Sequence, residues 1–341
     1  MAHELDMTRG QAAIAFRGAV PWHGLGAEIL PQDSLEDIRI KAGLDYDVIK
    51  TPALYSVPMD SAYPGRKGGG TGIATSSDRC VLYRSDTGDD LSVVSTKYQV
   101  VQPKQIVNFY RSLTEQYGFQ VEVVGALKGG RKVWALANTA NCINLPGEDR
   151  VKGYLLLATS YDGTMATQAR FTAIRVVCNN TLTLANSEGR PDVSVPHSAT
   201  FDEVKVKQDL GLGNAWNVFA ENAQHMVDTR KNNDDFARLL LASYYNLTTD
   251  AQISDFQADE KNNVSFDKLV KRMATALNDS PGAHLAAARD TLWGALQAVT
   301  FDVDHQAPSR SVDTRLDKAW FGTGDTIKRR AYEFATALAV K

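Results

Sequence analysis

The sequence predicts an α+β protein, in which helices back an antiparallel β-sheet with a β-β-β-α core and a mainly helical region follows. Two observations predict this class. Strand-length runs are separated by turn signals between residues 79 and 171, and apolar residues recur at helical spacing from residue 201 onward. The 341 residues are 43% hydrophobic and 23% charged, which is typical of a globular protein.

The N-terminal region, residues 1–75, is expected to contain one short helix. After the turn-rich PWHGLG at residues 21–26, Ser34 is a good N-cap and Gly43 a good stop, so residues 34–42 predict a helix. Residues 63–75 contain five glycines and one proline. Because that composition is flexible, we expect a Gly-rich loop to end this region.

The sheet core, residues 76–200, is expected to begin with a hairpin of strands 79–84 and 91–95. Pro103 then favours the start of a helix, whose apolar stripe ends at Gly118. Alternation next predicts two strands, 119–127 and 132–138, around the glycine turn between them.

The last hairpin of the core has the strongest signals. Residues 153–160 form an apolar run, Asp162-Gly163 is a turn dipeptide, and residues 164–171 alternate as a return strand. Beyond it, apolar residues from 174 to 182 fall at helical spacing. We therefore expect a helix after Phe171, packed on the sheet.

The C-terminal region, residues 201–341, is expected to be mainly helical. Its apolar stripes predict helices within residues 201–231, 234–245, 266–277, 282–298 and 326–339. The polar stretch at residues 304–315 interrupts them as a loop.

Charge is unevenly distributed along the chain. Residues 97–175 contain ten basic and five acidic residues, a formal charge of +5, which leaves −8 for the rest of a chain whose net charge is −3. Such segregation points to a polyanionic ligand, with scattered surface charge as the alternative.

The basic residues of this segment define the candidate nucleic-acid site. They cluster at a hairpin tip and at strand ends, where they could neutralise phosphates, and two amides follow them. The set is Lys128, Arg131, Lys132, Arg150, Lys152, Arg170, Arg175, Asn179 and Asn180. Nearby Tyr98, Tyr154, Tyr161 and Phe171 could stack on bases or could belong to the core.

Other chemistry finds little support in the sequence. Cys80, Cys142 and Cys178 form no C-x-x-C pair, so neither a zinc site nor a disulfide framework is expected. The acidic and histidine side chains of TFDVDH lack a second ligand cluster, and the glycines near residue 70 lack the G-K-[ST] of a phosphate loop. We expect no catalytic residue, metal or cofactor.

Several long motifs carry a resemblance to a known family. They are MAHELDMTRG and PWHGLG near the start, FTAIRVVCNNTL in the centre, and TLWGALQAVTFDVDH with RLDKAWFGTGDTIKRRA near the end. The chain resembles, over nearly its whole length, the family called domain of unknown function 932, which implies a gene carried on phages or plasmids but no activity. The order of its central elements is also similar to the β-β-β-α core of phage single-strand annealing proteins.

These observations together favour a phage-type protein that binds single-stranded DNA and promotes annealing or recombination without nucleotide hydrolysis. We expect a homo-oligomer that aligns its basic grooves along the strand. Apolar runs too short for a membrane span and a polar N-terminus predict no membrane contact and a location in the cytoplasm of the bacterial host. Two alternatives remain: a hydrolase or nucleotide-modifying enzyme that uses Cys178 or His23, and a host-takeover protein that binds another protein.

Overall fold

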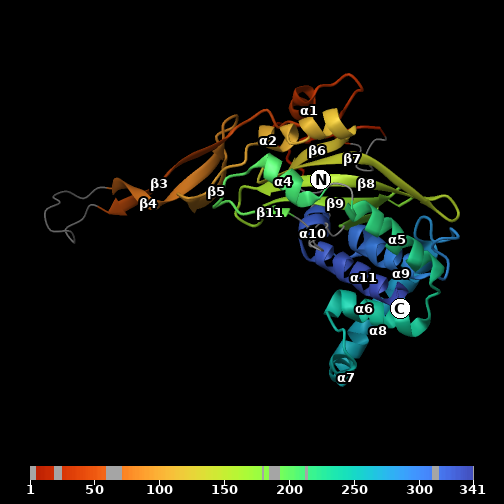
Figure 1. Cartoon of the computed structure of the whole chain (residues 1–341). Coiled ribbons are helices and arrows are strands. Elements are labelled where there is room, and N and C mark those ends of the chain that lie inside the picture. Colours follow the sequence, from red (N-terminus) through yellow and green to blue (C-terminus); the bar gives the residue numbers. More distant parts are fainter. Residues whose placement is uncertain are drawn as a thin grey trace.

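The computed structural model describes residues 5–18, 25–58, 71–178, 180–183, 193–211, 214–308 and 315–340. Of these described residues, 41% are helical and 29% lie in strands, and the sheets are mainly antiparallel, which confirms the α+β class. The sheets lie toward the N-terminal half of the chain, and a helical C-terminal region packs beside them (Figure 1).

The main sheet has the strand order β10-β9-β8-β7-β6-β1-β2, and β11 also pairs with β9. Its strands are β1 (Ile14–Phe16), β2 (Ala27–Glu28), β6 (Gln120–Leu127), β7 (Lys132–Leu145), β8 (Asp149–Ser160), β9 (Thr167–Arg175), β10 (Asn180–Thr183) and β11 (Val193–Val195). From β6 to β10 each strand pairs antiparallel with the next one in sequence. The predicted turns at 128–131 and Asp162-Gly163 therefore join neighbouring strands.

A second sheet forms an arm that projects from the body (Figure 1). It contains β3 (Val48–Pro58), β4 (Thr71–Arg84) and β5 (Asp90–Ser95) in that order. The predicted hairpin around residues 86–89 is confirmed. Residues 71–75 of the expected Gly-rich loop instead belong to β4, because they form backbone hydrogen bonds with β3 in an antiparallel ladder. Residues 59–70 lie outside the described part of the chain.

The root of the arm is held by charged groups. Arg84, fully buried, pairs with Asp6 and with Asp86 at 2.8 Å, and its guanidinium lies 4.0 Å from the centre of the Tyr46 ring. Arg9 also pairs with Asp86, at 2.7 Å. Since the Asp6 amide donates to the Ala126 carbonyl of β6 at 3.0 Å, these contacts join the arm to the main sheet.

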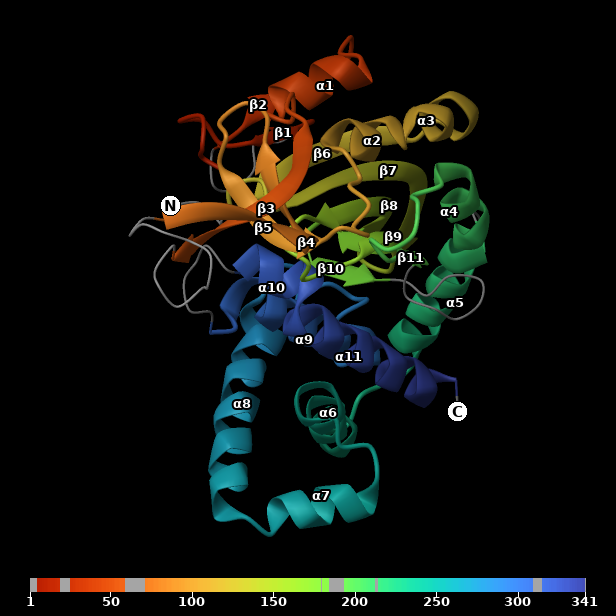
Figure 2. The same cartoon turned by 90° about the vertical axis from the view of Figure 1, so that its left-hand side faces the viewer.

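Helices lie on both sides of the main sheet (Figure 2). On one side are α1 (Leu35–Lys41), α2 (Pro103–Asn108) and α3 (Arg111–Tyr117). Ser34 caps α1 in a capping box with Asp37, and Gly118 ends α3 in the left-handed conformation at φ 69°, as predicted.

The C-terminal helices are α4 (Glu203–Leu210), α5 (Asn214–Asp228), α6 (Asn233–Leu240), α7 (Asp250–Gln257), α8 (Glu260–Asp279), α9 (Leu292–Phe301), α10 (Arg315–Phe321) and α11 (Thr323–Ala339), with π-helical turns at Leu241–Tyr245 and Asp302–Gln306. Of these helices, α9 and α11 contact β10, whereas α6, α7 and α8 lie farther from the sheet (Figure 2). The helix expected from residue 282 begins only at Leu292. Thr291 is its N-cap, and Asp290, at φ 59°, breaks the preceding turn.

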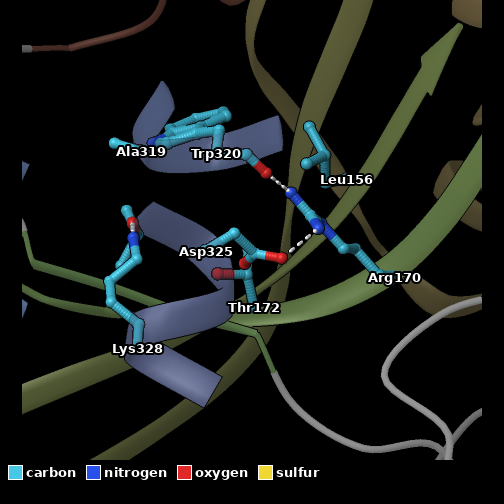
Figure 3. A pocket seen from close by; sticks show the side chains of 8 residues that line it. Leu156, Arg170, Thr172, Ala319, Trp320, Asp325 and Lys328 are labelled. Carbon is cyan, nitrogen blue, oxygen red and sulfur yellow. Dashed lines mark hydrogen bonds and ion pairs between the residues drawn. The ribbon is translucent and has the colours of Figure 1, made fainter. Parts of the chain in front are cut away.

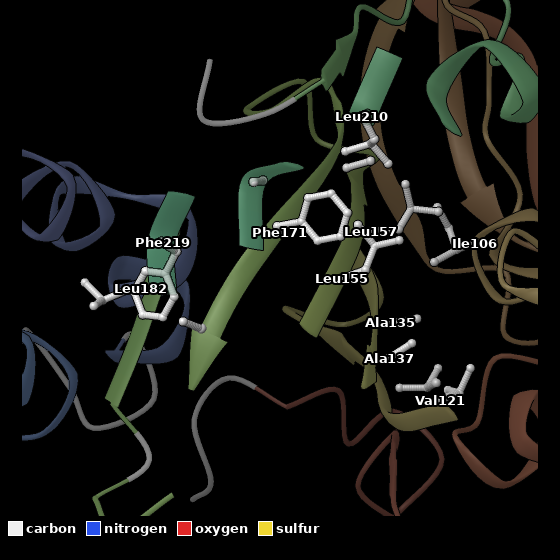
Figure 4. Packing of buried hydrophobic residues seen from close by; sticks show 14 of the residues in the cluster. Ile106, Val121, Ala135, Ala137, Leu155, Leu157, Phe171, Leu182, Leu210 and Phe219 are labelled. Atoms are coloured by element: carbon white, nitrogen blue, oxygen red, sulfur yellow. The ribbon is translucent and has the colours of Figure 1, made fainter. Parts of the chain in front are cut away.

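The core lies between the sheet and the helices (Figure 4). Ile106 of α2 faces Leu155 and Leu157 of β8, and the Tyr110 hydroxyl donates to the Leu155 carbonyl at 3.0 Å. Figure 4 also shows Phe219 of α5 among the buried side chains near β10. One continuous cluster thus joins the N-terminal and C-terminal helices through the sheet.

The prediction of a helix after Phe171 is wrong. β9 continues to Arg175, and β10 returns along it with Thr172 opposite Thr183 and Ile174 opposite Thr181. The spacing of these β-branched residues is compatible with the two-residue repeat of a strand as well as with the repeat of a helix. Hydrogen bonds to a neighbouring strand select the strand. The segment therefore adds a strand to the sheet edge.

Candidate nucleic-acid interface

The main sheet presents two different faces. One packs on α2 and α3; the other, here called the outer face, carries cations among apolar side chains. Cross-strand pairing and alternation place on the outer face Lys132, Trp134 and Leu136 of β7, Lys152, Tyr154 and Leu156 of β8, and Arg170, Thr172 and Ile174 of β9. Three strands thus each contribute one of the predicted basic residues.

Part of the outer face is covered by the C-terminal helices. Lys128 and Lys132 both pair with Asp317 of α10, the former at 2.6 Å. Burial would raise the pKa of Asp317, but hydrogen bonds from the two ammonium groups hold that pKa below its usual range. Both lysines, proposed as phosphate contacts, therefore already have a carboxylate partner.

Arg170 lies under the same helices (Figure 3). The side chain is 5% exposed, Nη1 donates to Asp325 of α11 at 3.1 Å, and Nη2 donates to the carbonyl of Trp320. The expectation of an exposed strand-end arginine is wrong for this residue, because residues 150 and 155 positions away in sequence cover it.

Arg175 is buried on the opposite face of the sheet. Its Nε donates to Asp149 at 2.7 Å, and Nη2 donates to the carbonyl of Gly282 at 2.9 Å. The Trp293 indole donates to the same Asp149 carboxylate at 3.0 Å. Only 2% of Arg175 is exposed, so the expected accessibility of this second arginine is also wrong; it holds β9 to the loop before α9.

Three of the remaining candidates have other positions. Arg131 donates to the Leu91 carbonyl at 2.8 Å and so joins the hairpin tip to β5 of the arm. Asn180 is the first residue of β10, opposite Arg175, and Asn179 lies outside the described residues. The nine predicted residues therefore do not form a single group.

Arg150 and Lys152 of β8 do lie together, in a groove at the uncovered end of the sheet. The groove has a volume of about 290 Å³ and is lined by Gly118, Gln120, Asn138, Ala140, Asn141, Cys142, Arg150 and Lys152. Two cations and three amides are present in this lining, and no carboxylate. Among the described residues, the Lys152 ammonium has no hydrogen-bond or ion-pair partner, whereas Arg150 Nε lies 3.1 Å from the Cys142 Sγ.

A bulge in β7 shapes this groove. The pairing of β7 with β8 is interrupted between Asn138 and Cys142, and Ala140 adopts a left-handed conformation at φ 64°. The bulge places Asn138, Asn141 and Cys142 beside the two cations. We missed these amides and Gln120 in the sequence; the NTAN segment, polar within an otherwise apolar strand, was the signal that could have indicated them.

The aromatic candidates belong mainly to the core. The hydroxyl of Tyr98 donates to the Ser160 carbonyl at 2.6 Å, that of Tyr161 donates to the Val101 carbonyl at 2.8 Å, and Phe171 is buried. Tyr154, 6% exposed, donates to Glu122 at 2.8 Å. The core alternative for these rings is confirmed.

The enzyme alternatives gain no support from their residues. Cys178 is buried, its Sγ accepts from Arg175 at 3.8 Å, and the His305 ring contacts the Cys178 carbonyl and not the thiol. His23 lies outside the described part. Asp302 and Asp304 have different partners, Arg272 and Lys328, and no group of three potential ligands among the described residues could hold a metal ion.

The fold and the groove define a mixed α+β protein with a surface site lined by cations and amides. The family model described as Domain of unknown function (DUF932) matches residues 90–320, and the chain belongs to this family. No curated protein and no solved structure matches the chain. Within the described helices, none is both long and apolar enough to cross a membrane.

Proposed function

We propose that the chain binds single-stranded DNA in the groove lined by Arg150 and Lys152, and promotes annealing or recombination without nucleotide hydrolysis. The observation that carries the proposal is the lining itself: two cations and three amides, with no carboxylate. Cations neutralise phosphates, and the free Lys152 ammonium is available for this role. In this proposal the protein acts in the cytoplasm of a bacterium that carries the phage or plasmid.

The amides favour a single strand over a duplex. Side-chain amides of Gln120, Asn138 and Asn141 can donate to and accept from base edges, and those edges are free only in unpaired bases. Asn138 Nδ2 is held at 2.9 Å from Glu122, and Asn141 Nδ2 at 3.0 Å from Thr139. Since these contacts fix the amides before a ligand arrives, less side-chain entropy is lost on binding.

The test is a titration of a fluorescent single-stranded oligonucleotide at several salt concentrations. In Arg150→Ala/Lys152→Ala we expect weaker binding, and a plot of log affinity against log salt that is shallower by about 1.4, because two phosphate contacts are lost. The control is Lys268→Ala/Lys271→Ala, which removes the same charge from exposed positions on α8.

Two results would overturn the proposal. One is that the unmodified protein fails to bind the oligonucleotide at low salt. The other is that the control pair weakens binding as much as the groove pair, since the effect would then depend only on net charge.

We also propose that the arm mediates self-association with a second copy of the chain. Leu54 is 63% exposed and Ile73 is 77% exposed, and the pairing of β3 with β4 places both on one face of the ribbon. Exposed apolar side chains on an extended ribbon favour a protein contact. This contact would place two grooves along one DNA strand.

A further inference from the structure

Helix α10 covers the cations of the outer face with acceptor groups that pair with them. Asp317 pairs with Lys128 and Lys132, while the Trp320 carbonyl and Asp325 of the following helix accept from Arg170 (Figure 3). One short segment and the start of α11 thus neutralise three of the seven cations that the sequence marks as phosphate contacts.

Aromatic rings of α10 complete the cover. Trp320 meets Trp134 of β7 edge to face, with centroids 5.1 Å apart. The Phe321 ring centre lies 5.6 Å from both the Lys132 ammonium and the Arg170 guanidinium. A single strand of DNA can make the same kinds of contact. Its phosphates can pair with lysines as the α10 carboxylate does, and its bases can stack on a tryptophan and on cations as the α10 rings do.

The fit between α10 and the sheet leaves polar groups unsatisfied. Trp134 Nε1 and Arg170 Nε are both buried, and neither finds a hydrogen-bond partner in the described part of the chain. Each such buried donor without a partner destabilises the covered state. A cavity of about 10 Å³, room for one water molecule, also lies beside Arg170, between Thr172 and Trp320.

Helix α10 also depends on its tertiary contacts. It has seven residues, of which only Ala319 is buried, and a helix of this length has little stability without its contacts to the sheet. The cover is therefore a short, half-exposed element over a surface with two unused donors.

We propose that the outer face beneath α10 is a second part of the nucleic-acid site, and that α10 occupies it until a single strand displaces the helix. Asp317 takes the place of a phosphate, and Trp320 and Phe321 take the place of bases. This inference rests on the proposed function. Trp134 and Arg170 then donate to the strand through the two nitrogens that have no partner under α10. Lys152, on the same face and on the neighbouring strand, links this surface to the groove.

The test compares Asp317→Asn with the unmodified full-length chain in the same oligonucleotide titration. We expect the variant to bind roughly tenfold more tightly, because a larger fraction of the protein has its outer face open. Asp255→Asn, at an exposed position on α7, is the control for net charge and should change little. Adding Lys132→Ala to Asp317→Asn should cancel the gain, because Lys132 then no longer contacts the strand.

A second measurement needs no variant. Hydrogen exchange of the unmodified protein should become faster in residues 315–321 when the oligonucleotide is added, while exchange in α9 stays unchanged. Two results would overturn the proposal that α10 covers part of the site, without affecting the proposed groove. One is equal affinity of Asp317→Asn and Asp255→Asn for the oligonucleotide, and the other is unchanged hydrogen exchange in α10 when DNA is bound. Absence of binding by every form at low salt would instead remove the proposed function, and the cover with it.

Discussion

At the scale of single residues, two arginines on strand β9 differ from one on β8 in whether their charge is buried in an ion pair or exposed to solvent. Arg170 and Arg175 are buried against Asp325 and Asp149, whereas Arg150 is exposed at the groove. A buried guanidinium must find a carboxylate, since an unpaired charge in the interior costs several kcal/mol. The first two arginines therefore stabilise the fold, and while α10 is in place Arg150 is the one of the three that a ligand can reach.

Removal of Arg175 should destabilise the protein strongly. Arg175→Ala would leave the fully buried Asp149 carboxylate with the Trp293 indole but without its countercharge, at a cost of about 3–5 kcal/mol. Urea unfolding followed by circular dichroism measures this change. Arg150→Ala is the matched control and should stay within about 0.5 kcal/mol of the unmodified protein; equal stability of the two variants would contradict the structural role.

Asp86 at the root of the arm should make stability depend on acid pH. Hydrogen bonds from Arg84 and Arg9 lower the pKa of Asp86 to about 2, against about 3.9 in an unfolded chain. The carboxylate therefore contributes fully above about pH 4, and its contribution is lost as the pH falls toward 2. With solvent screening the effect is on the order of 1 kcal/mol.

Asp86→Asn should flatten the dependence between about pH 4 and pH 2, measured by urea unfolding at a series of pH values. Asp78→Asn, on the exposed part of the arm, serves as the control. An unchanged slope in Asp86→Asn would show that the pair with Arg84 contributes nothing to the acid transition.

At the scale of elements, the sequence predicted correctly those turns and helix ends that depend on residues close together in the chain. The hairpins around residues 128–131 and Asp162-Gly163 and the helix after Ser34 depend on neighbours in sequence, and the structure confirms them. Residues 172–183 depend instead on a sheet edge, so their two possible periods could not be separated in advance. The same holds for the start of α9, which a left-handed residue at Asp290 delays.

The N-cap of α1 gives a test at this scale. Ser34→Ala removes the side chain that accepts from the Asp37 amide and breaks the capping box, so we expect a loss of about 1 kcal/mol. Ser34→Thr keeps the acceptor and should lose much less. Equal losses in thermal or urea unfolding would mean that the cap does not stabilise the helix.

At the scale of the whole molecule, the candidate site could be predicted only in part. The sequence marks the positive segment, and Arg150 and Lys152 are members of it. The neutralising groups lie far away in the chain: Asp317 is 185 residues from Lys132, and Asp325 is 155 from Arg170. A charge count along the sequence cannot include such partners, because only the packing of α10 on the sheet brings them together.

The arm provides a prediction about assembly. Leu54→Ser/Ile73→Ser should reduce self-association in light scattering over a range of protein concentrations, while the free energy of unfolding changes by less than about 0.5 kcal/mol, because both side chains are exposed. Val264→Ser, a similar change at an exposed site on α8, is the control. A monomeric unmodified protein at all concentrations would contradict the arm contact.

The position of α10 so late in the chain has a consequence for synthesis on the ribosome. Strands β6 to β9 pair with their sequence neighbours, so the sheet can form once Arg175 has emerged. Asp317 is synthesised 142 residues after Arg175, which corresponds to a delay on the order of ten seconds of translation. Throughout that interval Lys128, Lys132 and Arg170 face the solvent on a nascent chain that is surrounded by ribosomal RNA. A newly made copy is thus exposed to polyanions before its own helix can shield it.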